Sequence, residues 1–293
     1  MTLATLFTNS ERCEISFELF PPKTDKGMQN LQDNVQKLLR FNPAFLTCTY
    51  GAGGSTQSRT LEVVELVKQI SGLPVASHLT CVGSTVEQLN DYLTEAKRRG
   101  ADYIVALRGD PPQGSDEFQA VDGGLSYANE LVELIRRDHA DQFGIAVAGY
   151  PEVHQEAPNA QTDLDNLKRK VDAGADIIIT QLFYDNADFY RFRESCEAAG
   201  IRVPIIPGLL PVTNYKQAKR IAGMCKAAIP TEMSTAMSAN DDPDFQFECG
   251  VQHARNQTID LIHNGAPGIH YYVLNKSDAA EQLLSDIDFE KKA

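Results

Sequence analysis

The sequence contains no Cys-x-x-Cys pair, no G-x-G-x-x-G fingerprint and no apolar run of the ~18 residues that a membrane span needs. Its six cysteines are scattered over 293 residues, which excludes a disulfide framework and indicates reduced thiols in a reducing compartment. Residues 1–13 lack the basic segment and apolar run of a signal peptide. We therefore expect a cytoplasmic protein that does not enter a membrane.

Positive charge is also scarce, with 27 basic against 40 acidic residues and a formal net charge of −13. Such a balance repels nucleic acids and anionic membranes, which excludes both as partners. A small anionic ligand would need local cations or helix N-termini to bind. Neither His78 nor His154 has a second His or Cys at ligand spacing, so we expect no metal site.

Apolar strand-like runs alternate with amphipathic helical stretches eight times along the chain, as buried parallel strands and their covering helices do. The expected strands cover residues 15–20, 44–50, 75–81, 103–107, 145–148, 177–183, 204–210 and 269–274. The expected helices cover residues 28–40, 60–70, 86–99, 127–138, 160–173, 189–198, 215–222 and 278–287. Thr85 and Asn214 stand where N-cap residues are favoured.

Eight such repeats favour a closed (β/α)8 TIM barrel of the α/β class over a doubly wound sheet. Length alone would fit one barrel of ~250 residues with decoration or two domains of ~150 residues. No linker or low-complexity tract interrupts the pattern, so we expect a single domain over residues 1–293. The pattern lapses at residues 230–251, which predicts an enlarged connection before strand eight, with another helix at 247–263.

Polar residues gather at the expected carboxyl ends of the strands, where barrels of this type build their sites. A polar group inside an apolar strand costs free energy unless it is paired, so a ligand site explains so many of them. The residues concerned are Glu18, Thr49, Tyr50, His78, Arg108, Asp110, Tyr150, His154, Gln181 and Lys276.

Glu18 and Asp110 are the two acids of this set. Glu18 lies among aromatic residues and prolines, where burial would raise its pKa and suit a general acid; pairing with Lys or Arg is the alternative. Asp110 ends a rigid Arg-Gly-Asp-Pro-Pro turn. It could bind an amino-pyrimidine edge or stabilise a cation, or simply cap its own loop.

Two further features concern anion binding. Asp163, Asn166 and Lys170 share one face of an expected helix, which could receive a ribityl chain and phosphates or could be a solvated charged face. The glycine-rich segment 51–56 lacks the lysine and the spacing of a phosphate-binding loop.

Eight motifs together resemble the methylenetetrahydrofolate reductase family, in its compact bacterial form without the regulatory C-terminal domain of eukaryotic members. Among them are ISFELFPP at residues 15–22, LRGDPP at 107–112 and YPEVH at 150–154. The others lie at residues 49–52, 78–81, 166–175, 180–183 and 206–211. They run in order and cover nearly the whole chain, which makes the resemblance specific.

The resemblance implies a barrel that binds FAD non-covalently. It also implies ping-pong transfer of a hydride from NAD(P)H through the flavin to 5,10-methylenetetrahydrofolate. The product would be 5-methyltetrahydrofolate, which feeds methionine synthesis. A low-order homo-oligomer is expected for such a family, and the choice between NADH and NADPH stays open.

The resemblance also assigns roles to single residues. Glu18 matches the acid that assists opening of the folate five-membered ring, and Asp110 matches a residue near the flavin pyrimidine and the folate pterin. Folate contacts are implied for Gln181, Gln217 and Lys276, and nicotinamide contacts for Thr49 and Gln181. The implied FAD cradle consists of Tyr50, Ala52, His78, Arg108, Gly109, Asp110, Ala128, Tyr150, His154, Ala157, Asp163, Asn166, Arg169 and Lys170.

Two positions depart from the family pattern. Lys276 stands where the bacterial pattern has arginine, and lysine cannot make a bidentate contact. Ile221 stands where some relatives carry a phenylalanine for the nicotinamide adenine. Two other functions remain open: a flavin-free barrel lyase or aldolase acting on a phosphorylated metabolite, and a non-catalytic folate-binding or regulatory subunit. The presence of Glu18, Asp110 and Gln181 argues against the second.

Overall fold

The computed structural model describes residues 2–50, 57–110 and 118–290. In this part of the chain, parallel strands form one sheet in the order β7-β6-β5-β4-β3-β2-β1-β9-β8. The strands are β1 Glu14–Leu19, β2 Phe45–Cys48, β3 Val75–Thr80, β4 Tyr103–Leu107, β5 Gly144–Gly149, β6 Ile177–Thr180, β7 Ile205–Ile206, β8 Gly208–Leu209 and β9 Gly268–Tyr272.

The two short strands β7 and β8 are halves of the seventh strand that we expected at residues 204–210. They are separated by Pro207, which has no N–H to give to a sheet. β7 pairs with β6 and β8 pairs with β9, so this one run joins the two ends of the sheet. Gly208 fits there because a β-carbon would overlap the Thr180 carbonyl oxygen. The predicted (β/α)8 barrel is therefore confirmed, with its seventh strand broken.

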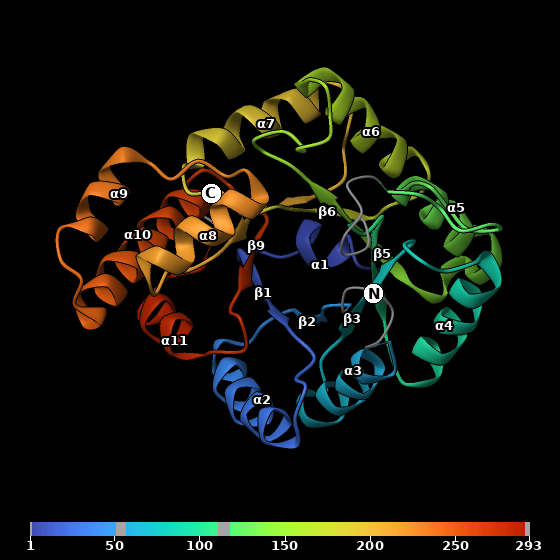
Figure 1. Cartoon of the computed structure of the whole chain (residues 1–293), viewed down its shortest axis with the longest axis horizontal. Helices are drawn as coiled ribbons and strands as arrows, with labels where there is room; N and C mark the ends of the chain where they lie inside the picture. Colours follow the sequence, from blue (N-terminus) through green and yellow to red (C-terminus); the bar gives the residue numbers. More distant parts are fainter. Residues whose placement is uncertain (1, 51–56, 111–117, 291–293) are drawn as a thin grey trace.

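The helices surround this barrel on the outside, apart from the short α1, which lies in the middle of the ring in Figure 1 and packs against the barrel interior. They are α1 Thr5–Thr8, α2 Asp25–Leu38, α3 Gln57–Ser71, α4 Val86–Arg98, α5 Ala128–His139, α6 Ala160–Asp172, α7 Asn186–Ala198, α8 Tyr215–Cys225, α9 Thr231–Ser238, α10 Pro243–His263 and α11 Asp278–Leu284. Both expected caps are confirmed, because the side chains of Thr85 and Asn214 accept hydrogen bonds from the backbone N–H of the third residue of α4 and of α8. None of the described helices combines the length and apolar character that crossing a membrane takes.

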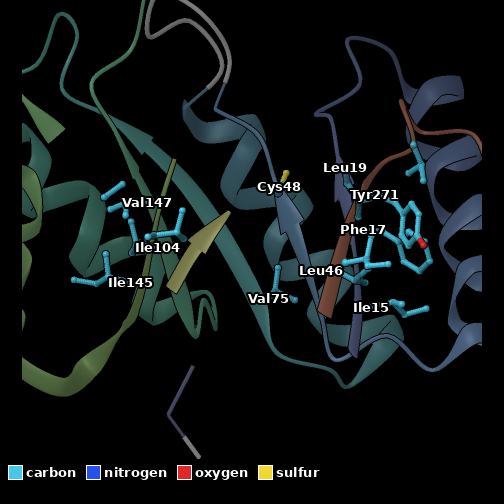
Figure 2. Packing of buried hydrophobic residues seen from close by; sticks show 14 of the residues in the cluster. Ile15, Phe17, Leu19, Leu46, Cys48, Val75, Ile104, Ile145, Val147 and Tyr271 are labelled. Atoms are coloured by element: carbon cyan, nitrogen blue, oxygen red, sulfur yellow. The ribbon is translucent and has the colours of Figure 1, made fainter. Parts of the chain in front are cut away.

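Alternation along the strands decides which residues face the barrel interior. Ile15, Phe17 and Leu19 belong to the apolar layer between strands and helices (Figure 2). Because successive side chains of a strand point to opposite faces, Ser16 and Glu18 point inward. The barrel interior near the amino-terminal ends of the strands is apolar, and α1 packs against it. Its members are Leu3, Phe7, Phe45, Ala76, Tyr103, Val105, Ala146, Ile177, Ile179 and Ile206.

The enlarged connection before the last strand is also present. α10 begins at Pro243, earlier than the expected helix at 247–263, because Pro243 fits a first helical turn and Asp242 caps Phe245 N. α9 was not expected, and its buried Met233 and Met237 pack in an apolar cluster together with α8 and residues that follow β6 and β8. Helices α8, α9 and α10 thus cover the broken side of the barrel.

Candidate active site

Glu18 is the next-to-last residue of β1 and is 7% exposed inside the barrel. Burial raises the pKa of its carboxyl group to about 8, so Glu18 holds a proton at neutral pH. The expected burial of this carboxyl group is therefore confirmed, and its role as an acid stays a prediction. No lysine or arginine pairs with it among the described residues, so the salt-bridge alternative with those residues does not hold.

Two histidines approach the same oxygen of Glu18. His78 Nε2 lies 3.5 Å from Glu18 Oε2, and His270 Nε2 lies 4.0 Å from it. Burial lowers the pKa of His78 to about 4. Burial and the neighbouring His78 lower the pKa of His270 to about 3. Both imidazoles are therefore neutral at neutral pH, and the cluster carries a single transferable proton on the carboxyl group.

His270 was not among the residues that the sequence indicated. It lies on β9 in register with Ser16, whose hydroxyl is 2.8 Å from His270 Nδ1, and its ring stacks on Phe45. These contacts fix the ring plane, so that Nε2 stays directed at Glu18. The polar positions of β9 could have been found from its period-two alternation, since Gly268, His270 and Tyr272 share one face.

Asp110 lies three residues after β4, at the same end of the barrel as Glu18, and its side chain is exposed. Burial raises the pKa of the Tyr150 phenol, and the charges of Asp163 and Asp110 raise it further. Burial, then Glu18, Cys225 and Tyr150, raise the pKa of Tyr272. The two carboxyl groups thus act on neighbouring phenols, Tyr150 and Tyr272, at the carboxyl-terminal mouth of the barrel.

Gly109 shapes the turn that carries Asp110. Its φ of +91° suits glycine, and an added β-carbon would come within 2.8 Å of Val82 Cγ1 and 3.1 Å of Thr80 Cβ. We expect Gly109→Ala to destabilise the fold by ~1–3 kcal/mol, since both strain and overlap oppose the alanine. Chemical denaturation measures this loss.

Gly123→Ala is the matched control for that substitution. Gly123 has a φ of +73°, yet nothing lies within 4 Å of its added β-carbon, so this variant reports backbone strain alone. Equal losses of stability in the two variants would contradict close packing at Gly109.

Lys170 of α6 is half-buried against the end of β5. Its Nζ donates to the Ala148 carbonyl oxygen at 2.6 Å and lies 5.8 Å from the centre of the Tyr150 ring. Burial lowers the pKa of Lys170 to about 8, against the opposing charge of Asp163. Asp163 accepts from His154 N at 3.0 Å, and the His154 ring packs edge-on against Tyr150. This part of the helix face is therefore not simply solvated.

The remaining predicted residues lie at different depths. Asn166 and Arg169 bond to each other on the exposed side of α6. Six residues are half-buried at strand ends, near helix starts or in the connection between β5 and α6: Thr49, Tyr50, Ala128, Ala157, Gln181 and Gln217. Lys276 is exposed. Ala52 lies outside the described residues. The structure therefore brings Glu18 and His78 together, and gathers Tyr150, His154, Asp163 and Lys170 in a second group.

Asn275 is a further residue that the sequence did not indicate. Its side chain accepts from Phe20 N at 2.8 Å and donates to Phe20 O at 2.7 Å, which ties the chain after β9 to the end of β1. Asn275 adopts a φ of +57°, a conformation that asparagine tolerates better than most residues. This contact fixes the rim of the barrel at the end of the strand that carries Glu18.

The fold and site define a (β/α)8 barrel with a polar, proton-holding site at the carboxyl ends of its strands. The sequence model of the methylenetetrahydrofolate reductase family matches residues 4–288, and the chain belongs to that family. It is 42% identical over 265 residues to the 5,10-methylenetetrahydrofolate reductase of Escherichia coli (strain K12), with 90% of this chain and 87% of that protein covered.

Other relatives are longer or more distant. The chain is 39% identical over 290 residues to methylenetetrahydrofolate reductase (NADH) 1 of Arabidopsis thaliana, covering 96% of this chain and 49% of that protein. It thus spans about half the length of the plant relatives it matches. A Clostridium thermocellum protein that binds two copies of 5-methyl-5,6,7,8-tetrahydrofolic acid superposes with a TM-score of 0.62 at 18% identity over 96% of both chains, which supports the fold alone.

Proposed function

We propose that this protein is a flavin-dependent reductase that converts 5,10-methylenetetrahydrofolate to 5-methyltetrahydrofolate with NAD(P)H. The observation that carries the proposal is Glu18, a carboxyl group that keeps its proton to about pH 8 inside a barrel of this family. Opening the folate five-membered ring needs a proton donor at neutral pH, and an ordinary surface glutamate would already be ionised.

The residues at the mouth of the barrel fit FAD. Lys170 reaches the end of β5 and Arg108 directly follows β4, and a dinucleotide diphosphate needs such positive charge. The Thr80 hydroxyl is buried beside Gly109 and has no hydrogen-bond partner among the described residues. A bound ligand would satisfy such a hydroxyl. Lys170 comes from the second group of predicted residues, Arg108 from the turn after β4 and Thr80 from the end of β3.

Bound FAD would supply the carrier that takes a hydride from the nicotinamide and later gives it to the folate methylene group. One flavin face serves both substrates, so the two would bind in turn. Thr49 and Gln181 would contact the nicotinamide, and Gln181, Gln217 and Lys276 would contact the folate. Gln181 suits two ligands because its amide can both donate and accept.

Glu18 would donate its proton to N10 of the folate as the bond between N10 and the methylene carbon breaks. The electron pair of that bond goes to N10, and the positive charge stays on the iminium at N5. His78 and His270 are neutral neighbours, so they do not remove the proton from Glu18 at neutral pH. Asp110 would stabilise the iminium cation by its negative charge.

We further propose that residues 1–293 form one catalytic domain that works in the cytoplasm as a low-order homo-oligomer, without nucleic-acid, membrane or metal partners. Anaerobic half-reactions test the proposed function. Purified protein should absorb near ~450 nm, as flavins do. It should be bleached by NADH or NADPH and regain its colour with methylenetetrahydrofolate. A colourless protein that cannot be reconstituted with FAD would instead favour a flavin-free barrel enzyme.

Asp110→Asn should weaken folate binding and slow re-oxidation by methylenetetrahydrofolate by ~10²-fold, because the amide no longer offsets the iminium charge. Stopped-flow measurement of the two half-reactions checks this result. Asp122→Asn is a suitable control, since Asp122 is an exposed acid in the same connection between β4 and α5. Unchanged kinetics in the Asp110 variant would remove this residue from the site.

A further inference from the structure

Arg108 is held by a two-point contact with a glutamate that the proposed function does not use. Its Nη1 and Nη2 atoms donate to the two carboxylate oxygens of Glu156 at 2.6 and 2.7 Å. Its Nε donates to Gly109 O at 3.2 Å, and the guanidinium lies 5.0 Å from the centre of the Phe118 ring. The guanidinium edge formed by Nη1 and Nη2 is therefore fully engaged by Glu156.

The two partners differ in how firmly they are held. The side chain of Arg108 is 21% exposed and that of Glu156 is 44% exposed. Arg108 directly follows β4, whereas Glu156 lies in the connection between β5 and α6, outside any helix or strand. Within the described residues, Arg108 is the sole hydrogen-bond partner of the Glu156 carboxylate. Moving the Glu156 side chain out of this contact therefore disturbs less packing than moving Arg108.

A carboxylate and a phosphate present the same pair of oxygens to a guanidinium group, and arginine binds either one in the same forked geometry. One guanidinium edge cannot hold both at once. Arg108 lies among the residues that fit FAD, and FAD carries a diphosphate. Glu156 therefore occupies the position on Arg108 that a phosphate oxygen pair would take.

We propose that Glu156 acts as an internal substitute for the cofactor phosphate, which holds Arg108 in the free protein and is displaced when FAD binds. The inference rests on the proposed function. Only the fraction of molecules with Arg108 released binds the diphosphate, so Glu156 lowers the apparent FAD affinity and slows association. Dissociation is unaffected, because Glu156 has already left Arg108 in the complex.

The test compares FAD binding to the apoprotein of the wild type and of Glu156→Gln. Glutamine keeps the size of the side chain but loses the charge that competes with phosphate. We expect the Kd for FAD to fall by about five-fold and the association rate to rise by the same factor, as for a partly exposed ion pair. Flavin fluorescence titration and stopped-flow mixing give both quantities without any measurement of turnover.

Two controls isolate the contact with phosphate. Asp165→Asn removes the same charge from α6 at an exposed residue that bonds Gln161, so it reports the general effect of charge on FAD binding. Riboflavin has no phosphate, so Glu156→Gln should leave its affinity unchanged.

Three results would overturn the inference while the wild type still binds FAD: an unchanged FAD affinity in Glu156→Gln, a weaker one, or an equal gain for riboflavin. A weaker affinity would mean that Glu156 orients Arg108 in the complex. If the wild-type protein does not bind FAD at all, the proposed function itself is contradicted. This outcome differs from the three above, in which the wild type binds FAD.

Discussion

Glu18→Gln is expected to slow the reduction of methylenetetrahydrofolate by ~10²–10⁴-fold while flavin reduction by nicotinamide stays close to the wild-type rate. Glutamine fills the same volume and can donate a hydrogen bond, but it cannot transfer a proton to N10. The hydride step from the nicotinamide needs no such proton. Anaerobic stopped-flow spectroscopy of each half-reaction separates the two effects.

Glu14→Gln is the matched control for this variant. Glu14 lies on the same strand as Glu18, but it is only half-buried and its carboxylate accepts from Ser10 instead of facing the histidines. Normal folate turnover in Glu18→Gln would refute the role of Glu18 as the acid. Equal losses in both half-reactions would point to a damaged barrel.

The pH dependence of folate reduction by the wild type is a second test of Glu18 as the acid. Burial raises the pKa of Glu18 to about 8, so the acid is protonated below this pH and ionised above it. The rate of folate reduction should therefore be high near neutral pH and should fall as the pH rises through about 8. Glu18→Gln should lose this fall, whereas Glu14→Gln should keep it.

Removal of the Lys170 charge is expected to weaken FAD binding by roughly 10–100-fold, the usual effect of losing a hydrogen bond to a charged group. Lys170 is a half-buried cation of α6, and its Nζ donates to the Ala148 carbonyl oxygen near the end of β5. Lys170→Met keeps the apolar stem and the packing, and Lys170→Ala removes both stem and charge. Fluorescence titration of each apoprotein with FAD measures the effect.

Lys168→Ala serves as the control on the same helix, because Lys168 pairs with Asp172 on the exposed face. It removes an equal charge at a position that does not contact β5. An unaltered FAD dissociation constant in both Lys170 variants would mean that this face of α6 does not bind the cofactor.

The strands and most helices could be predicted because the barrel buries its strands on both faces, which leaves continuous apolar runs in the sequence. The break at Pro207 is not predicted from the sequence, because the apolar run continues on both sides of the proline and indicates one strand. α1 and α9 are too short to show a clear helical period, and the role of α1 in closing the barrel depends on contacts with distant strands.

The candidate site was predicted in part. Glu18 was recognised because a single acid interrupts an apolar strand, and its burial is confirmed; its catalytic role stays a prediction. His270 and Asn275 were not recognised, because their partners Ser16 and Phe20 lie about 250 positions away in sequence. The Arg108–Glu156 pair was missed for a similar reason, since Glu156 stands among loop residues with no pattern of their own.

The pairing of β1 with β9 joins the beginning of the chain to its end, and Asn275 and Phe20 fasten this seam. Before β9 docks, Glu18 would face water on one side and would be an ordinary, ionised glutamate. The raised pKa of Glu18 thus depends on the closed ring of strands. A chain that folds only as far as β6 could present every cofactor group described above and still lack a proton to give.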